Sequence, residues 1–277
     1  MSHKTLSNNV YLIFLSQLLS LNMPIIQYCS DLHIEFPHNR DYLKQHPIEP
    51  VGEILVLAGD VVPFIAKGKF EYFLDKLARD FKEVYWIAGN HEFYHSDIKG
   101  YTGSFCKKLK RNLFLVNNHQ VQVGNTRLLF STLWTKISKQ FEWEIANSMS
   151  DFHIIKDHGN KFTPRRASDL FEENIAFLRS TMSENQEGVT TIVVTHHVPT
   201  FKEYPEKYKG SVLSEGFAVE LASFIENSAI DYWIYGHHHF NTPPFRVGNT
   251  QMLTNQLGYV SQGEHSNYNS NCCIEVN

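Results

Sequence analysis

Side chains that can bind metals or transfer protons follow apolar runs at five places in this 277-residue sequence. In chain order these groups are Asp31 with His33, Asp60, Asn90 with His91, His196, and His237 with His239. Carboxylates, an amide oxygen and imidazoles together suit divalent cations of mixed nitrogen and oxygen preference. Each group alone is also an ordinary turn sequence. A shared site therefore requires that the fold bring the five groups together.

The spacing of these groups predicts that they meet. Asp60 lies 29 residues after Asp31, and Asn90 lies 30 residues after Asp60. About 30 residues make one strand–helix repeat of a parallel sheet, and ligands of open α/β sheets bind beyond the carboxyl ends of the strands. His196 and His237 are separated by one loop, one predicted helix and one predicted strand. We therefore expect all five groups at one edge of a sheet.

The elements that must position these groups are predicted from apolar patterns. Apolar runs that precede the groups predict buried strands, at 25–29, 53–58, 84–88, 190–195 and 231–235. Apolar residues at helical spacing predict amphipathic helices, at 69–81, 141–149, 163–182 and 214–227. Strands that alternate with helices predict an α/β fold with a parallel-type sheet.

Other segments carry weaker patterns. A helix with a basic outer face is predicted over 103–112, and a local meander of three short strands over 113–131. Three prolines are expected to break up the polar connection 37–50, and short β segments are expected around 245–247, 251–254 and 273–276.

Composition limits the class of function. Apolar residues make up 42% of the chain and charged residues 19%, as in an ordinary globular protein. The net charge of −4 argues against long nucleic acids as partners. The four cysteines form no Cys-x-x-Cys pair, so we expect free thiols in a reducing compartment.

Residues 1–22 are interpreted as an N-terminal appendage to a single domain over 23–277. The segment 10–21 is almost wholly apolar and resembles part of a signal peptide, but no A-x-A cleavage pattern follows. It is shorter than the roughly 20 apolar residues that span a bilayer. We therefore expect a cytoplasmic protein with no stable membrane span. Export is the alternative, if residues 1–22 act as a signal.

The donor set favours two metal ions. Counting the expected ligands gives two carboxylates, one amide oxygen and four imidazoles, too many for one tetrahedral zinc. Two divalent ions fit this set if one carboxylate bridges them, and Mn, Fe or Zn suit the mixed donors. The neutral Asn90 leaves the metal pair electropositive, which suits a phosphate ester. A mononuclear zinc amidohydrolase is disfavoured by the ligand count and by the asparagine.

The ordered motifs resemble the calcineurin-like metallophosphoesterase superfamily over roughly residues 24–260. They are Asp31-x-His33, Gly59-Asp60, Gly89-Asn90-His91-Glu92, Thr195-His196 and Gly236-His237-x-His239. The resemblance implies an α/β fold, a four-layer α/β/β/α sandwich of two mixed β-sheets flanked by helices. It also implies that a metal-bound hydroxide hydrolyses a phosphate mono- or diester. A non-catalytic scaffold is disfavoured because no ligand position is missing, and a nuclease because a basic surface is lacking.

The resemblance assigns roles to individual residues. The residues implied to bind one metal are Asp31, His33 and His239, and those implied to bind the other are Asn90, His196 and His237. Asp60 is implied to bridge the two ions. His91 is implied to be catalytic, contacting the phosphate and protonating the leaving oxygen. His196 is preferred to His197 as the ligand because it directly follows a predicted strand.

A small phosphorylated substrate is the expected partner, and the oligomeric state is left open. The expected substrate contacts are Asn90, His91, Tyr94 and Asn255. The segment Asn255–Tyr259 resembles the closing motif of an uncharacterised, bacterial-type subgroup of the superfamily, and Trp134 and 150–153 resemble that subgroup's insert over the cleft. A structural role is favoured for this insert, and Glu92 is expected to hydrogen-bond nearby backbone or a ligand histidine.

Overall fold

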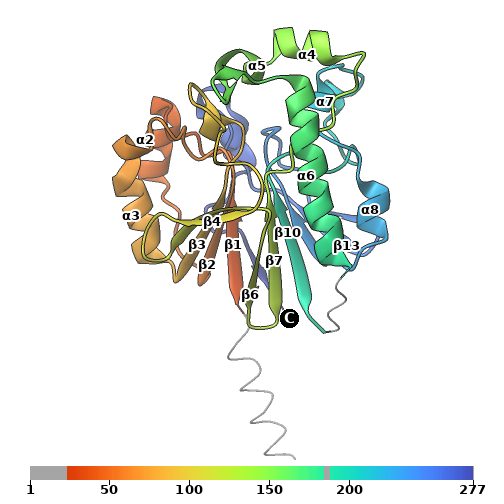
Figure 1. Cartoon of the computed structure of the whole chain (residues 1–277). Helices are drawn as coiled ribbons and strands as arrows, with labels where there is room; N and C mark the ends of the chain where they lie inside the picture. The colour runs from red at the N-terminus through yellow and green to blue at the C-terminus, as the bar shows by residue number, and fades with distance from the viewer. Residues whose placement is uncertain (1–23, 184–187, 277) are drawn as a thin grey trace, which may run out of the picture.

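Short apolar strands form the centres of two six-stranded sheets. A computed structural model describes residues 24–183 and 188–276, so the expected appendage 1–22 lies outside the described residues. The sheets pack face to face, and helices cover their outer faces (Figure 1). This arrangement confirms the predicted four-layer sandwich. Among the described residues, no helix combines the length and apolar character that crossing a bilayer requires.

The first sheet has the order β14-β1-β2-β3-β5-β4. Its parallel centre consists of β1 (Ile25–Cys29), β2 (Ile54–Ala58), β3 (Glu83–Ile87) and β5 (Leu113–Asn117). Its antiparallel edges are β14 (Cys273–Glu275) and β4 (Phe105–Lys108).

The second sheet has the order β12-β13-β11-β10-β7-β6. Its parallel centre consists of β7 (Thr126–Ser131), β10 (Thr190–Thr195), β11 (Tyr232–Ile234) and β13 (Thr250–Leu253). Its antiparallel edges are β12 (Phe245–Val247) and β6 (His119–Val123).

Helices lie on both outer faces and above the carboxyl ends of the strands (Figure 1). The first sheet is covered by α2 (Pro37–Gln45) and α3 (Glu71–Asp80), and the second by α6 (Pro164–Met182) and α8 (Ala222–Glu226). The upper end carries α4 (Glu142–Ser148), α5 (Asp151–Ile154) and α7 (Ser214–Phe217). The remaining short elements are η1 (Lys67–Phe70), η2 (His91–Phe93), η3 (Glu206–Tyr208), η4 (Val260–Gln262), η5 (Glu264–Asn267), β8 (Lys156–Asp157) and β9 (Asn160–Lys161).

Alternation along the strands explains the layers. In β2, Ile54 and Val56 pack between the two sheets, whereas Leu55 and Leu57 pack outward against α3. Successive strand residues point to opposite faces, so a strand that is apolar throughout can fill two cores. Burying each such side chain contributes about 1.5–3 kcal/mol. These strands therefore form a rigid frame for the loops at their carboxyl ends.

Two predicted helices are wrong. The segment 103–112 contains the edge strand β4, in which Cys106 and Lys108 are exposed and alternate with half-buried residues. Exposed lysines suit an edge strand as well as a helix surface. The predicted helix 214–227 is two short helices, because the backbone N–H groups of Val219 and Leu221 bond to the loop after β10.

Two predicted connections also differ from the structure. The segment 37–50 contains α2, which begins at Pro37 because proline is tolerated in the first helical turn. The predicted meander over 113–131 is divided between the sheets: β5 pairs with β3, whereas β6 and β7 form a hairpin in the second sheet. The chain crosses at Asn118, a buried residue with φ of 43°.

Candidate functional site

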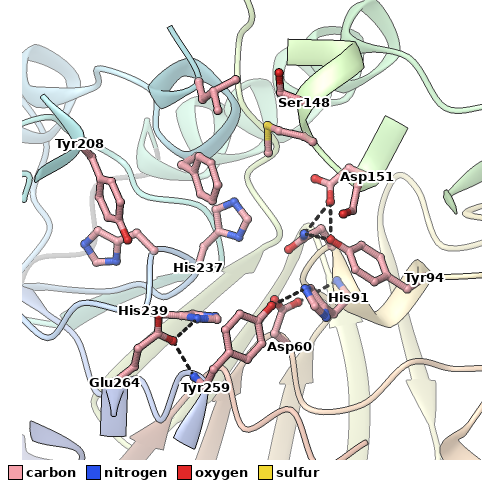
Figure 2. A pocket seen from close by; sticks show the side chains of 16 residues that line it. Asp60, His91, Tyr94, Ser148, Asp151, Tyr208, His237, His239, Tyr259 and Glu264 are labelled. Atoms are coloured by element: carbon pink, nitrogen blue, oxygen red, sulfur yellow. Dashed lines mark hydrogen bonds and ion pairs between the residues drawn. The ribbon is translucent and has the colours of Figure 1, made fainter. Parts of the chain in front are cut away.

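The five predicted groups lie together beyond the carboxyl ends of β1, β2, β3, β10 and β11. Figure 2 shows Asp60, His91, His237 and His239 around one cavity. Donor atoms of one set lie within 4.8 Å of one another, and this set is Asp31, His33, Asp60 and His239. A second set on the same criterion is Asp60, His196 and His237. Asp60 belongs to both sets. The spacing argument from the sequence therefore predicted the convergence correctly.

The first set is closely packed around His239. Its Nε2 lies 2.9 Å from Nε2 of His33 and 3.3 Å from Oδ1 of Asp31. Oδ2 of Asp60 lies 3.8 Å from Nε2 of His33. Imidazole nitrogens and carboxylate oxygens that face one point in this way fit a divalent cation of mixed donor preference.

The amide oxygen of Asn90 adjoins the second set. Nε2 of His196 lies 3.1 Å from this oxygen, 3.1 Å from Nδ1 of His237 and 3.5 Å from Oδ1 of Asp60. The other ring nitrogen of His196 lies 2.9 Å from the carbonyl oxygen of Ala58, which orients the ring. These donors also fit a divalent cation.

The adjacent residues His196 and His197 direct their rings to different places. His197 packs against Trp134, with ring centres 5.0 Å apart, and its Nδ1 lies 3.3 Å from the carbonyl oxygen of Thr132. Burial and the neighbouring His196 lower the pKa of His197 to about 3. Only His196 is directed into the donor set, which supports the choice of His196. His238 likewise lies outside both sets and contacts Gln256 at 3.2 Å.

The backbone is left-handed at most of the candidate ligands. The φ angles are 55° at Asp31, 45° at His33, 55° at Asp60, 80° at His237 and 50° at His239. Each such conformation costs a non-glycine residue about 1–3 kcal/mol and persists only where the surroundings impose it. These strained conformations therefore lower the stability of the fold, and they direct the side chains toward the site.

Glycines before the candidate ligands leave space for them. A Cβ atom on Gly89 would lie 2.2 Å from Oδ1 of Asp60, and one on Gly236 would lie 2.5 Å from Oδ2 of Asp31. The equivalent atom on Gly59 would lie 2.3 Å from Nδ1 of His196. These distances are shorter than any van der Waals contact, so the motifs require glycine for steric reasons.

Glu92 joins two of the loops by hydrogen bonds to the backbone. Its carboxylate accepts from the backbone N–H groups of Asp60, Val61 and Gly89, at 2.9, 2.7 and 2.6 Å. It also accepts from the indole of Trp86 at 3.2 Å. The expectation that Glu92 bonds nearby backbone is confirmed.

His91 lies beside the two sets and has contacts on three sides. Its ring stacks on Tyr94, with centres 3.9 Å apart, and its Nε2 lies 3.3 Å from the hydroxyl of Tyr259 (Figure 2). Its Nδ1 lies 3.4 Å from Oε1 of Glu35, which is equally far from Nδ1 of His33. His33, Glu35 and His91 thus form a third group that could hold an ion. Glu35 was not predicted from the sequence as a site residue. Its position two residues after the candidate ligand His33 could have indicated that it lies near the site.

The insert over the cleft contributes Asp151. Oδ1 of this buried carboxylate accepts hydrogen bonds from Nδ2 of Asn90 and from the hydroxyl of Tyr94, both at 2.8 Å (Figure 2). The first bond directs the amide oxygen of Asn90 toward His196. Asp151 therefore positions a candidate ligand, which is more specific than the general structural role predicted for this insert.

The C-terminal loop closes the other side of the site. Oε2 of Glu264 accepts from the backbone N–H of Tyr259 at 2.6 Å and lies 2.8 Å from Nδ1 of His239 (Figure 2). Glu264 thereby orients the His239 ring, and the sequence offered no signal for it.

Asn255 does not line the cavity that lies over the donor sets. Its Nδ2 donates to the carbonyl oxygens of Tyr28 and Asn269, at 2.9 and 2.8 Å, and its Oδ1 accepts from the N–H of Asn269. The Asn255 amide thus joins the C-terminal segment to β1. The expectation that Asn255 contacts the substrate is therefore corrected. Of the four expected contacts, the cavity is lined by Asn90, His91 and Tyr94.

Comparison with known proteins identifies the family. The family profile described as calcineurin-like phosphoesterase matches residues 25–241. The chain belongs to this family. It is therefore a metal-dependent phosphoesterase.

Two proteins are similar to this chain over most of its length. An uncharacterized protein, L509, from Acanthamoeba polyphaga mimivirus is 27% identical over 280 residues, 92% of this chain and 97% of that protein. The crystal structure of phosphopantetheinyl hydrolase (PptH) from Mycobacterium tuberculosis matches with a TM-score of 0.70. Its sequence identity is 16%, and the match covers 92% of this chain and 97% of that one. The structural match to phosphopantetheinyl hydrolase supports the sandwich fold.

The charges of the donor sets predict that metal binding by this phosphoesterase releases protons. Burial opposes protonation of His196 and His239, but nearby carboxylates outweigh it and raise their pKa values to about 9 and about 10. We therefore expect both rings to be protonated at pH 7, and a ring that binds a metal would lose its proton. If both rings bind a metal, we expect about two protons released per chain. The affinity should rise as the pH approaches these pKa values.

Calorimetric titration with Mn²⁺ at pH 7, in buffers of different ionisation enthalpy, measures this release. A heat of binding that does not depend on the buffer would contradict the prediction.

Proposed function

We propose that this chain hydrolyses a phosphate ester with two divalent metal ions held beyond the carboxyl ends of its strands. The observation that carries the proposal is the position of Asp60. Its carboxylate lies in both donor sets and is 1% exposed. A carboxylate in this position is suited to bridging two cations.

The chain would hold the two ions with separate ligands. Asp31, His33 and His239 would bind one, and Asn90, His196 and His237 the other. Mn, Fe or Zn fit these donors. When bound, such a pair lowers the pKa of a water molecule and neutralises charge on the phosphoryl oxygens.

His91 is suited to donate a proton to the leaving oxygen. Burial lowers its pKa, but the carboxylates of Asp60 and Glu35 outweigh this and raise the pKa above the usual value. This direction favours the protonated ring, which is the form that a general acid requires. Stacking on Tyr94 and the contact with the Tyr259 hydroxyl hold the ring in place.

The dimensions of the cavity favour a small substrate. The cavity over the donor sets has a volume of about 310 Å³ and is walled by Tyr94, Tyr208, Phe217 and Tyr259. This volume is at the lower end of the range for small-molecule sites. A monoester or a compact diester fits this space better than a long polymer.

Hydrolysis of chromogenic esters tests the proposal. Protein stripped of metal and reloaded with Mn²⁺, Zn²⁺ or Fe²⁺ is assayed on p-nitrophenyl phosphate and bis-p-nitrophenyl phosphate. We expect hydrolysis of at least one ester with two ions bound per chain. Two bound ions without hydrolysis of either ester would support a scaffold instead, and one bound ion would contradict the dinuclear mechanism.

A further inference from the structure

A second cavity adjoins the one over the donor sets. Its volume is about 210 Å³, and four of its lining residues also line the larger cavity. These shared residues are Tyr208, Leu213, Phe217 and His238. We call the smaller cavity the aromatic annex. Its own wall is completed by Tyr204 and by Ser211 and Ser214 of the loop before and within α7. The two cavities therefore adjoin at these four side chains.

The annex is mainly aromatic and aliphatic. The ring of Tyr204 lies 6.2 Å from that of Tyr208 and is stacked at 6.0 Å on that of His238. The imidazole of His238 is in turn held by Gln256. Figure 2 shows Tyr208 across the cavity from Asp151 and Tyr94. A flat apolar group entering the annex would thus contact rings, while a phosphate attached to it stays near the donor sets.

Within the described part of the chain, neither cavity is lined by lysine or arginine. Besides the donor Asp60, two carboxylates at the cavity wall are already bonded: Asp151 to Asn90 and Tyr94, and Glu264 to His239 and Tyr259. The exposed Lys207 lies outside both linings, with its ammonium 4.6 Å from the centre of the Tyr208 ring. A second phosphate on the substrate would therefore find no lysine or arginine in the wall of either cavity.

We propose that the aromatic annex binds the organic part of the substrate, an uncharged apolar group about the size of one aromatic ring, on an ester with a single phosphate. This inference rests on the proposed function, because it assumes that the phosphate lies over the donor sets. It assigns substrate specificity to the loop that carries Tyr204 and Tyr208, and it disfavours nucleoside polyphosphates.

Binding of phosphonates to the metal-loaded protein tests the proposal without requiring turnover. Methylphosphonate, benzylphosphonate and phosphonoacetate share the phosphonate group. They differ in the attached group that would enter the annex, which is a methyl, a benzyl or a carboxymethyl group. By calorimetry we expect benzylphosphonate to bind at least about tenfold more tightly than methylphosphonate, because a ring loses apolar contact with water. Phosphonoacetate, with its added carboxylate, is expected to bind no more tightly than methylphosphonate.

A variant that fills the annex localises the effect. Ser211 is exposed, and Ser211→Trp places an indole in the annex. We expect this variant to reduce the ratio of the methyl- to the benzylphosphonate dissociation constant to about one. The matched control is Ser180→Trp, at an exposed position of α6 outside both cavities, which is expected to keep the ratio. The phosphonate series on the unmodified protein gives the same test if the variant does not fold.

The outcomes separate this inference from the proposed function. Equal affinities for methyl- and benzylphosphonate, or an advantage for benzylphosphonate that Ser211→Trp does not reduce, would overturn the annex. So would hydrolysis of chromogenic esters by protein that binds neither phosphonate. If the protein bound benzylphosphonate more tightly than methylphosphonate but showed no metal-dependent hydrolysis, the result would support apolar binding in the annex and overturn the hydrolytic function.

Discussion

Asp60→Asn is expected to reduce phosphoester hydrolysis by more than about 100-fold and to lower the metal content to at most one ion per chain. The carboxylate belongs to both donor sets and is buried among imidazoles of both. Asparagine keeps the size of the side chain but removes its charge, so the two cations would face each other without a shared anion. Metal analysis after dialysis and assay on p-nitrophenyl phosphate measure the two effects.

Asp169→Asn is the matched control for this substitution. Asp169 is exposed on α6, and the same chemical change there is expected to leave metal content and turnover unaltered. If Asp60→Asn retained two ions and full turnover, Asp60 would not be the bridge.

His91→Ala is expected to keep both metal ions and to lower turnover by about 10²–10⁴-fold, the contribution typical of a general acid. The loss should be larger for benzyl phosphate than for p-nitrophenyl phosphate, because a poor leaving group depends more on protonation. Metal analysis and kcat for the two esters test this prediction. His38→Ala, at an exposed position of α2, is the matched control.

The result for metal content also decides between two roles of His91. His33, Glu35 and His91 form a group that could itself hold an ion. Loss of one ion in His91→Ala would assign His91 to metal binding and would contradict its role as proton donor.

The residues near strand ends were predictable from the sequence, because the apolar patterns of strands and helices repeat over short stretches of sequence. The apolar runs before Asp31, Asp60 and Asn90, together with their spacing, indicated one shared edge, and the structure places their donors there. The glycines of the motifs were visible too, although their steric reason emerges only from the distances to Asp60 and Asp31.

The segments predicted wrongly share a physical cause. In β4 the lysines Lys107 and Lys108 fit an edge strand and a helix surface equally, and pairing with β5 decides between them. Within 214–227 the apolar pattern fits a helix, but hydrogen bonds from Val219 and Leu221 to the loop after β10 break it. Tertiary hydrogen bonds override local propensity where the pattern is compatible with two structures.

The sequence by itself indicated which candidate donor side chains share one edge of the fold, since periodicity reports which positions are buried and where strands end. Only the tertiary structure decided which groups support them. Asp151 reaches Asn90 across 61 residues, and Tyr259 reaches His91 across 168. The reason is that contacts between remote loops depend on how the two sheets pack, which no local pattern encodes. The aromatic annex is a product of the same packing, because Tyr204, Phe217 and His238 meet only when the sandwich has formed.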